Sequence, residues 1–501
     1  MKYSKPFFSN NTHYFLGIAL VLPIFFSSMA MAGSFRSQCP DKTTLHPNGS
    51  SDDLNHPGKV KCQEIAGSDG YATMGDGNQI YLFGFGPLSG RGLIDQGLPG
   101  TQTAVDFNFP LVYLPNGNID PKANGAAIEP QAKMNGGVLS AQQPAPMMAI
   151  DEDDELFLTL SNVGMIMRPD LFEQHTVHFH GYPNASSFFD GVPDASVAIN
   201  VAGSFTYYYT APDAGTYFWH CHISPPEHLQ MGMVGQMYVR PRQNRVPIGN
   251  DLGAALKIAN MKAPEATNGI GCSDLLCTGQ TPLPASASAD GKTGKTADGR
   301  KYAYNDGDGT TVYDKEYPMQ LMGFDPNFHY VGMTFNPESF KDMKDKYFMI
   351  SGRSYPDTIA DGSNAAAPGN DATVPGNIQT LDADGAVRTS QPVKSKIVLT
   401  HGQRALLRIS ELVITEHHTI ATVGIPMLVI ANNARLLRDM DGNNLYYKTN
   451  SITLGGGESA DVIIDSAGIP AGTYFLYTTN LDHLSNDAEN FGGQMTEIEV
   501  I

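Results

Sequence analysis

The chain has 501 residues, enough for about two to four domains with buried cores. Its formal net charge of −19 argues against nucleic acid as a partner, because a polyanion would be repelled. Only 17% of the residues are charged, whereas the chain holds 52 Gly, 33 Pro, 22 Tyr and 24 Phe. This composition favours many short strands joined by turns over long helices.

The N-terminus has the pattern of a secretory signal peptide. Lys2 and Lys5 precede an apolar run over 14–26, and small residues follow up to Ala32. We therefore predict a signal peptide over 1–32 that is cleaved after Ala32. The apolar run is too short for a membrane span, and no later stretch reaches the length of one. An exported protein, periplasmic or secreted, is expected.

The cysteines fit an oxidising compartment. Cys39 and Cys62 flank one loop, and Cys272 and Cys277 lie close together, so two disulfides are plausible. Cys221 is then the odd thiol. Its place between His220 and His222 indicates a metal ligand.

In chain order, short apolar runs such as 80–83 suggest first strands within a Gly-rich stretch. An acidic turn over 151–155 feeds an alternating strand over 156–160, and strand signals continue to Val239. Residues 285–300 have the composition of a linker or surface loop. The predicted segments are an N-terminal extension with first strands over 33–134, a β domain over 135–243, a linker or loop region over 244–315, and a second β domain over 316–501.

The two β domains look like copies of each other. Residues 175–183 can be laid on 418–426, 214–222 on 471–479, and 235–237 on 493–495, in the same order. The simplest account is two copies of one β-sandwich.

The first copy carries a dense group of histidines. Alternate residues of a strand share a face, so His178 and His180 point the same way and His175 points the other way. The same alternation in His220-Cys221-His222 places Cys221 opposite its two neighbours. Two clusters are therefore predicted. One comprises His178, His180, His220 and His222, and the other comprises His175, Cys221, His228 and Met233.

Each cluster suits copper. Two imidazoles, a thiolate and a weak thioether form the ligand set of a blue-copper electron-transfer site. The four-imidazole cluster suits copper as well, and it includes neither a carboxylate pair nor a phosphate-binding loop. Because Cys221 is joined to both flanking histidines through the peptide chain, electrons can pass through bonds from the first metal to the second.

These motifs resemble the multicopper oxidases, the laccase-like enzymes, whose ligand domain carries His-x-x-His-x-His-Gly and a later His-Cys-His followed by His and Met. The resemblance implies type 1 copper ligands at His175, Cys221, His228 and Met233. It also implies half of a trinuclear type 2/type 3 cluster. Residues 347–356 are similar to the opening of a further family domain. The residues implied to carry catalysis are His178, His180, His220, Cys221 and His222.

Together, the repeat and the resemblance predict an all-β chain. It would hold two cupredoxin-like Greek-key β-sandwiches, an N-terminal extension and a long linker. The implied activity is a one-electron oxidation of a small-molecule or metal-ion donor, with transfer to O2.

The second copy departs from the family pattern because it lacks most ligands. Every ligand position except that of His418 is replaced, and the replacements include Ala421, Val423, Tyr477 and Thr479. The interval from Cys221 to His228 is also longer than is usual in laccase-like members, and it includes Pro225 and Pro226.

Three hypotheses follow from the missing half of the cluster. In the first, a homo-oligomer completes the cluster across a symmetric interface. In the second, the chain is a copper enzyme similar to nitrite reductases, with His418 or His483 as a ligand given to a neighbouring subunit. In the third, it is a non-catalytic copper-binding or electron-transfer protein. We favour the oxidase, in which Asp190 or Asp194 could relay protons.

Overall fold

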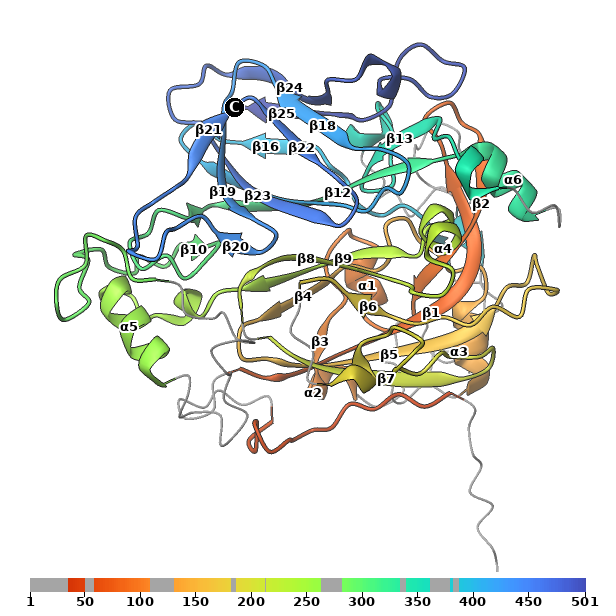
Figure 1. Cartoon of the computed structure of the whole chain (residues 1–501), viewed down its shortest axis with the longest axis horizontal. Helices are drawn as coiled ribbons and strands as arrows, with labels where there is room; N and C mark the ends of the chain where they lie inside the picture. Colours follow the sequence, from red (N-terminus) through yellow and green to blue (C-terminus); the bar gives the residue numbers. More distant parts are fainter. Residues whose placement is uncertain are drawn as a thin grey trace, which may run out of the picture. The chain divides into compact units, whose positions relative to one another are not determined.

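The protein was analysed as a computed structural model. The model describes residues 35–49, 58–108, 130–181, 186–211, 213–262, 282–333, 339–360, 379–381 and 387–501. The predicted signal peptide over 1–32 and the pair Cys272 and Cys277 lie outside these residues. Strands dominate the described chain and form two β-sandwiches (Figure 1). The predicted all-β fold class is confirmed.

The first sandwich has two sheets around an apolar core. One sheet has the order β2-β1-β5-β7, with β3 beside β1, and the other has the order β4-β9-β8-β6. Strand β1 lies between β2 and β5 and is buried almost throughout, so the strands expected in an N-terminal extension belong to this sheet. The bounds are β1 Val60–Thr73, β2 Gln79–Pro87, β3 Gln102–Thr103, β4 Met148–Asp151, β5 Glu155–Gly164, β6 His178–Phe179, β7 Ser204–Thr210, β8 Gly215–His220 and β9 Val234–Arg240.

The second sandwich repeats this plan. Its sheets have the orders β13-β12-β17-β23-β19-β20, with β21 beside β19, and β16-β25-β24-β18-β22. The bounds are β12 Lys315–Phe324, β13 Tyr347–Ile350, β16 Ile397–Leu399, β17 Arg404–Glu411, β18 His418–Thr422, β19 Met427–Asn432, β20 Arg435–Leu436, β21 Tyr447–Thr449, β22 Ser451–Leu454, β23 Glu458–Asp465, β24 Gly472–Thr478 and β25 Met495–Val500.

Short elements connect and flank the sandwiches. The strands β10 Lys301–Tyr302 and β11 Val312–Tyr313 form one small ladder, and β14 Gln379–Leu381 and β15 Val387–Thr389 form another. The helices are α1 Arg91–Ile94, α2 Ala104–Phe107, α3 Pro130–Gly137, α4 Pro225–Met231, α5 Leu252–Lys262 and α6 Pro326–Met333. Within the described ranges no helix is long and apolar enough to cross a membrane.

The pairing register supports the internal repeat. His178 pairs with His220 between β6 and β8, and Ala421 pairs with Tyr477 between β18 and β24. These are equivalent positions in the repeat, so the two copies share one strand geometry although the second lacks the histidines.

One part of the predicted repeat is wrong. His220 pairs with Val234 in the first copy, and Tyr477 pairs with Met495 in the second. Val234 therefore corresponds to Met495, and the match of 235–237 with 493–495 is displaced by three residues. The equivalence of the two copies is set by the hydrogen bonds between their strands. A three-residue identity such as Gly-Gln-Met is too short to fix it. The counterpart of Met233 is Gln494.

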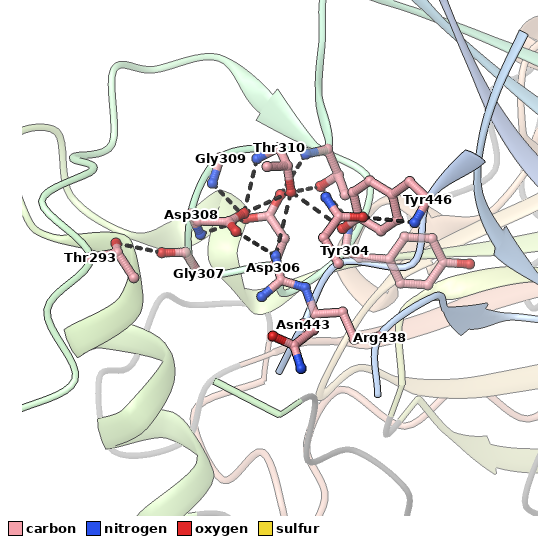
Figure 2. A network of polar contacts seen from close by, with 12 residues as sticks. Thr293, Tyr304, Asp306, Gly307, Asp308, Gly309, Thr310, Arg438, Asn443 and Tyr446 are labelled. Carbon is pink, nitrogen blue, oxygen red and sulfur yellow. Dashed lines mark hydrogen bonds and ion pairs between the residues drawn. The ribbon is translucent and has the colours of Figure 1, made fainter. Parts of the chain in front are cut away.

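Much of the region over 244–315, predicted as a linker, is folded. Asp306 accepts hydrogen bonds from the Gln243 side chain at 2.8 Å and from the Gly309 amide at 2.8 Å. Asp308 accepts one at 2.6 Å from Arg438, whose side chain is 1% exposed (Figure 2). Protein donors thus hold both carboxylates, and Tyr304 packs with residues of the second sandwich. Linker composition did not reveal this burial.

Candidate metal centres

Three donors meet in the core of the first sandwich. One ligand atom from each of His175, Cys221 and His228 lies within 4.8 Å of the others, and all three side chains are fully buried. The Cys221 Sγ lies 3.3 Å from the His228 Nδ1 and 4.0 Å from the His175 Nδ1. Two imidazoles and a thiol are thus arranged around one point.

Different elements deliver these donors. His175 exchanges backbone hydrogen bonds with Ile199, and Cys221 directly follows β8. The long interval after Cys221 forms helix α4, whose first residues are Pro225 and Pro226, and His228 lies on this helix. Proline favours a first helical turn, so the insertion that departs from the family spacing builds the support of His228.

The surroundings favour the thiolate. Burial alone would raise the pKa of the Cys221 thiol, but His228 and His175 beside it hold that pKa well below its usual value. Burial would lower the pKa of His228, yet Cys221 and Glu173 raise it to about 9. An isolated charge would be costly at this depth, so the pair favours a thiolate beside a cation.

Met233 lies in the same buried cluster as Cys221. The Met233 carbonyl oxygen accepts a hydrogen bond from the Cys221 amide at 3.1 Å, and the Met233 amide donates to His228 at 2.8 Å. The Met233 backbone is therefore hydrogen-bonded to the backbone of both donor residues.

Two residues beside this donor set were not predicted from the sequence. The Glu173 carboxylate lies 3.7 Å from the His228 Nε2, and its side chain is 29% exposed. Gly67 on β1 faces the His175 ring, because a Cβ at Gly67 would lie 2.6 Å from the His175 Cδ2. Glu173 is two residues from His175, so proximity was a usable signal, but Gly67 is distant in sequence.

A second set of imidazoles lies where β6 and β8 pair. One nitrogen from each of His178, His180 and His220 lies within 4.8 Å of the others. The Nε2 atoms of His180 and His220 are 2.9 Å apart. Burial and the neighbouring histidines lower the pKa of His180 to about 4 and that of His220 to about 3. Both rings are therefore neutral at pH 7 and offer lone pairs to a metal.

His222 borders this set. Its ring centroid lies 5.0 Å from that of His178 and 5.6 Å from that of His220. The His222 amide donates to the Thr176 hydroxyl at 2.9 Å, which ties the two histidine motifs together. His178 in turn places its Nδ1 2.7 Å from the Asp190 carbonyl oxygen, so its Nε2 is left for a ligand.

Other histidines of the sequence lie elsewhere. His329 is buried, and its ring nitrogens contact the carbonyl oxygens of Tyr81 and Gln230, as a core residue would. His418 and His483 come together with Glu416 in the second sandwich.

Comparisons with known proteins agree with this geometry. Residues 125–244 match the family model described as multicopper oxidase. The chain is 32% identical over 108 residues to the multicopper oxidase MCE of Talaromyces pinophilus, which is 21% of this chain and 16% of that protein. It is 31% identical over 109 residues to laccase abr2 of Aspergillus fumigatus, which is 21% of this chain and 17% of that one.

The fold has a counterpart among solved structures. The blue copper oxidase of Nitrosomonas europaea aligns with a TM-score of 0.50 at 17% identity, covering 88% of this chain and 85% of the other. Residues 125–244 are thus similar to a domain of the multicopper oxidases, a family that uses copper. The chain's matches span only about a sixth of the curated relatives named above.

The donors themselves fit copper. The nitrogen that lies near the Cys221 Sγ is Nδ1 in both His175 and His228. A buried thiolate between two imidazoles suits copper better than a hard cation, and neutral imidazoles suit copper in either oxidation state.

Proposed function

We propose that the chain is a copper-dependent oxidoreductase of the multicopper oxidase type. It takes single electrons from a reducing substrate at a type 1 site and passes them to O2 at a histidine-rich copper cluster. His175, Cys221, His228 and Met233 would hold the first metal. His178, His180, His220 and His222 would hold metal in the second site. Copper bound in these sets would supply the one-electron couple and the place of O2 reduction.

The observation that carries this proposal is that one peptide serves both donor sets. Cys221 contributes its thiol to the first set, while its neighbours His220 and His222 face the second. A single stretch of backbone thus fixes the distance between the sites and connects them through covalent bonds.

The residues around the sets have supporting roles in this proposal. Glu173 orients His228 through its Nε2, and the Asp190 carbonyl oxygen orients His178. The Asp190 carboxylate, 3.6 Å from the His178 Nδ1, would carry protons toward the second site. Burial of the first set excludes water from it.

The second set offers four imidazoles, which is half of the usual cluster. We propose that a second copy of this chain supplies the other half, because a two-fold interface presents the same patch twice. Export, directed by residues 1–32, would place the protein in the periplasm or outside the cell. The electron donor would be a small molecule or a metal ion.

Two variants of the copper-loaded protein test the proposal. His178→Gln should keep the blue thiolate–copper band and lose O2 consumption, whereas Cys221→Ser should lose both. Ala195→Ser, an exposed site in the same region, is the matched control and should keep both. A wild-type protein that reduces nitrite but not O2 would contradict the proposal.

A further inference from the structure

The second sandwich has a cluster of possible metal donors at the position that the first site takes in the first sandwich. His418 stands at the position of His175. Thr478 takes the place of Cys221, since its amide donates to the Gln494 carbonyl at 2.9 Å as the Cys221 amide does to Met233. The thiol and the thioether are thus replaced by a hydroxyl and an amide.

Other possible metal-binding side chains lie at this position. One ligand atom from each of Glu416, His418 and His483 lies within 4.8 Å of the others. The His483 Nε2 is 3.0 Å from the Glu416 carboxylate, and the two imidazole centroids are 5.0 Å apart. His483 comes from a short turn over Leu481–His483, so the set joins β18 to the loop after β24.

The two imidazoles are buried and incompletely bonded. His418 is 0% and His483 is 2% exposed. His418 Nε2 and His483 Nδ1 have no hydrogen-bond partner among the described residues. A buried polar atom without a partner is unfavourable, so two such nitrogens in one cluster point to a missing ligand.

Neighbouring side chains also hold the cluster in place. The Phe348 ring stacks on His483 with centroids 3.8 Å apart, and the Gln494 amide contacts the His418 Nδ1 at 2.8 Å. Glu416 brings a carboxylate whose side chain is 40% exposed, which leaves an entry path for an ion.

We propose that Glu416, His418 and His483 bind a borderline divalent cation such as Zn²⁺. Two imidazoles and one carboxylate are a zinc-type donor set, and the same set would accept Cu²⁺. Because Thr478 replaces the cysteine, this site has no thiolate and no blue band. The proposal uses none of the residues of the proposed oxidase sites and stands independently of that function.

The test measures zinc bound per chain in the full-length, copper-loaded protein. The wild type, Glu416→Gln, His483→Gln and His417→Gln are incubated with Zn²⁺, dialysed and analysed for metal. His417 is the matched control, because it precedes His418 but is exposed and outside the donor set. Far-ultraviolet circular dichroism reports folding, and the exposed Glu416 keeps the test usable if His483→Gln misfolds.

The wild type and His417→Gln should each retain one Zn²⁺ per chain more than Glu416→Gln and His483→Gln. Equal zinc content in all four proteins would overturn the proposal. Uptake of Ca²⁺ in place of Zn²⁺ would also overturn it, because calcium prefers oxygen ligands and would not use the imidazoles.

Discussion

The His220 Nδ1 lies 2.7 Å from the carbonyl oxygen of Cys221, the residue that follows it. Nδ1 therefore donates to this carbonyl and leaves the Nε2 lone pair directed to the second donor set. The dipeptide His220-Cys221 thus carries an imidazole of the second set and the thiol of the first set. The hydrogen bond within it fixes the orientation of the imidazole.

Glu173 should tune the first site through His228. In Glu173→Gln the carboxylate 3.7 Å from the His228 Nε2 loses its charge. The imidazole then becomes a weaker donor, and removal of such an outer partner lowers metal affinity about 10–100-fold. Copper titration followed by the blue band measures this change. Asp170→Asn, whose carboxylate pairs with Arg168, is the control and should bind as the wild type does.

Gly67 should be required for the position of His175. In Gly67→Ala the new methyl group would lie 2.6 Å from the His175 ring, so the ring must move. The blue band should shift or weaken, as read in the visible spectrum. Gly84→Ala on β2, where the nearest atom would be 3.3 Å away, is the control. An unchanged spectrum in Gly67→Ala would show that His175 is not a ligand.

Glu411 should make the stability of the second sandwich depend on pH. Burial, with Glu458 nearby, raises the pKa of Glu411 from 4.5 to about 9. The native state keeps the carboxyl protonated, whereas the unfolded chain ionises it above 4.5. This residue therefore costs stability increasingly as pH rises from about 4.5 to about 9.

The variant Glu411→Gln should remove that cost. Its stability relative to the wild type should increase between about pH 5 and about pH 8, as measured by urea unfolding with a chelator present. Glu489→Gln, at an exposed position, should show no such trend. A constant difference between Glu411→Gln and the wild type would contradict the pKa assignment.

The disulfide between Cys39 and Cys62 should stabilise the first sandwich. It ties the N-terminal segment to β1 over a sequence separation of 23 residues. The double variant Cys39→Ser, Cys62→Ser should lose about 2–4 kcal/mol of unfolding free energy, because the unfolded chain regains entropy. Its blue band should stay, since Cys221 is the free thiol. Equal stability with the wild type would refute this role.

Sequence reasoning reached the fold class and the separation of the two donor sets. Both depend on local spacing: alternation along a strand places His178 and His180 on one side and His175 on the other. It failed where contacts come from distant segments. The packing of Gly67 against His175 leaves no mark in the motif, and neither does the burial of Asp306 within the region predicted as a linker.

The second sandwich shows that equivalent residues of two repeats are assigned reliably only from the pairing of their strands. The Gly-Gln-Met match hid the equivalence of Met233 and Gln494, which emerged only from strand pairing. His483 was considered as a possible ligand for a neighbouring subunit, and the sequence gives no sign that it meets Glu416 and His418.

The most direct test of the account is O2 consumption by the copper-loaded wild-type protein while it oxidises a one-electron dye. We predict that O2 uptake follows dye oxidation and that both cease in Cys221→Ser. A protein with a full blue band that consumes no O2 with phenols, metal ions or dyes would contradict the account.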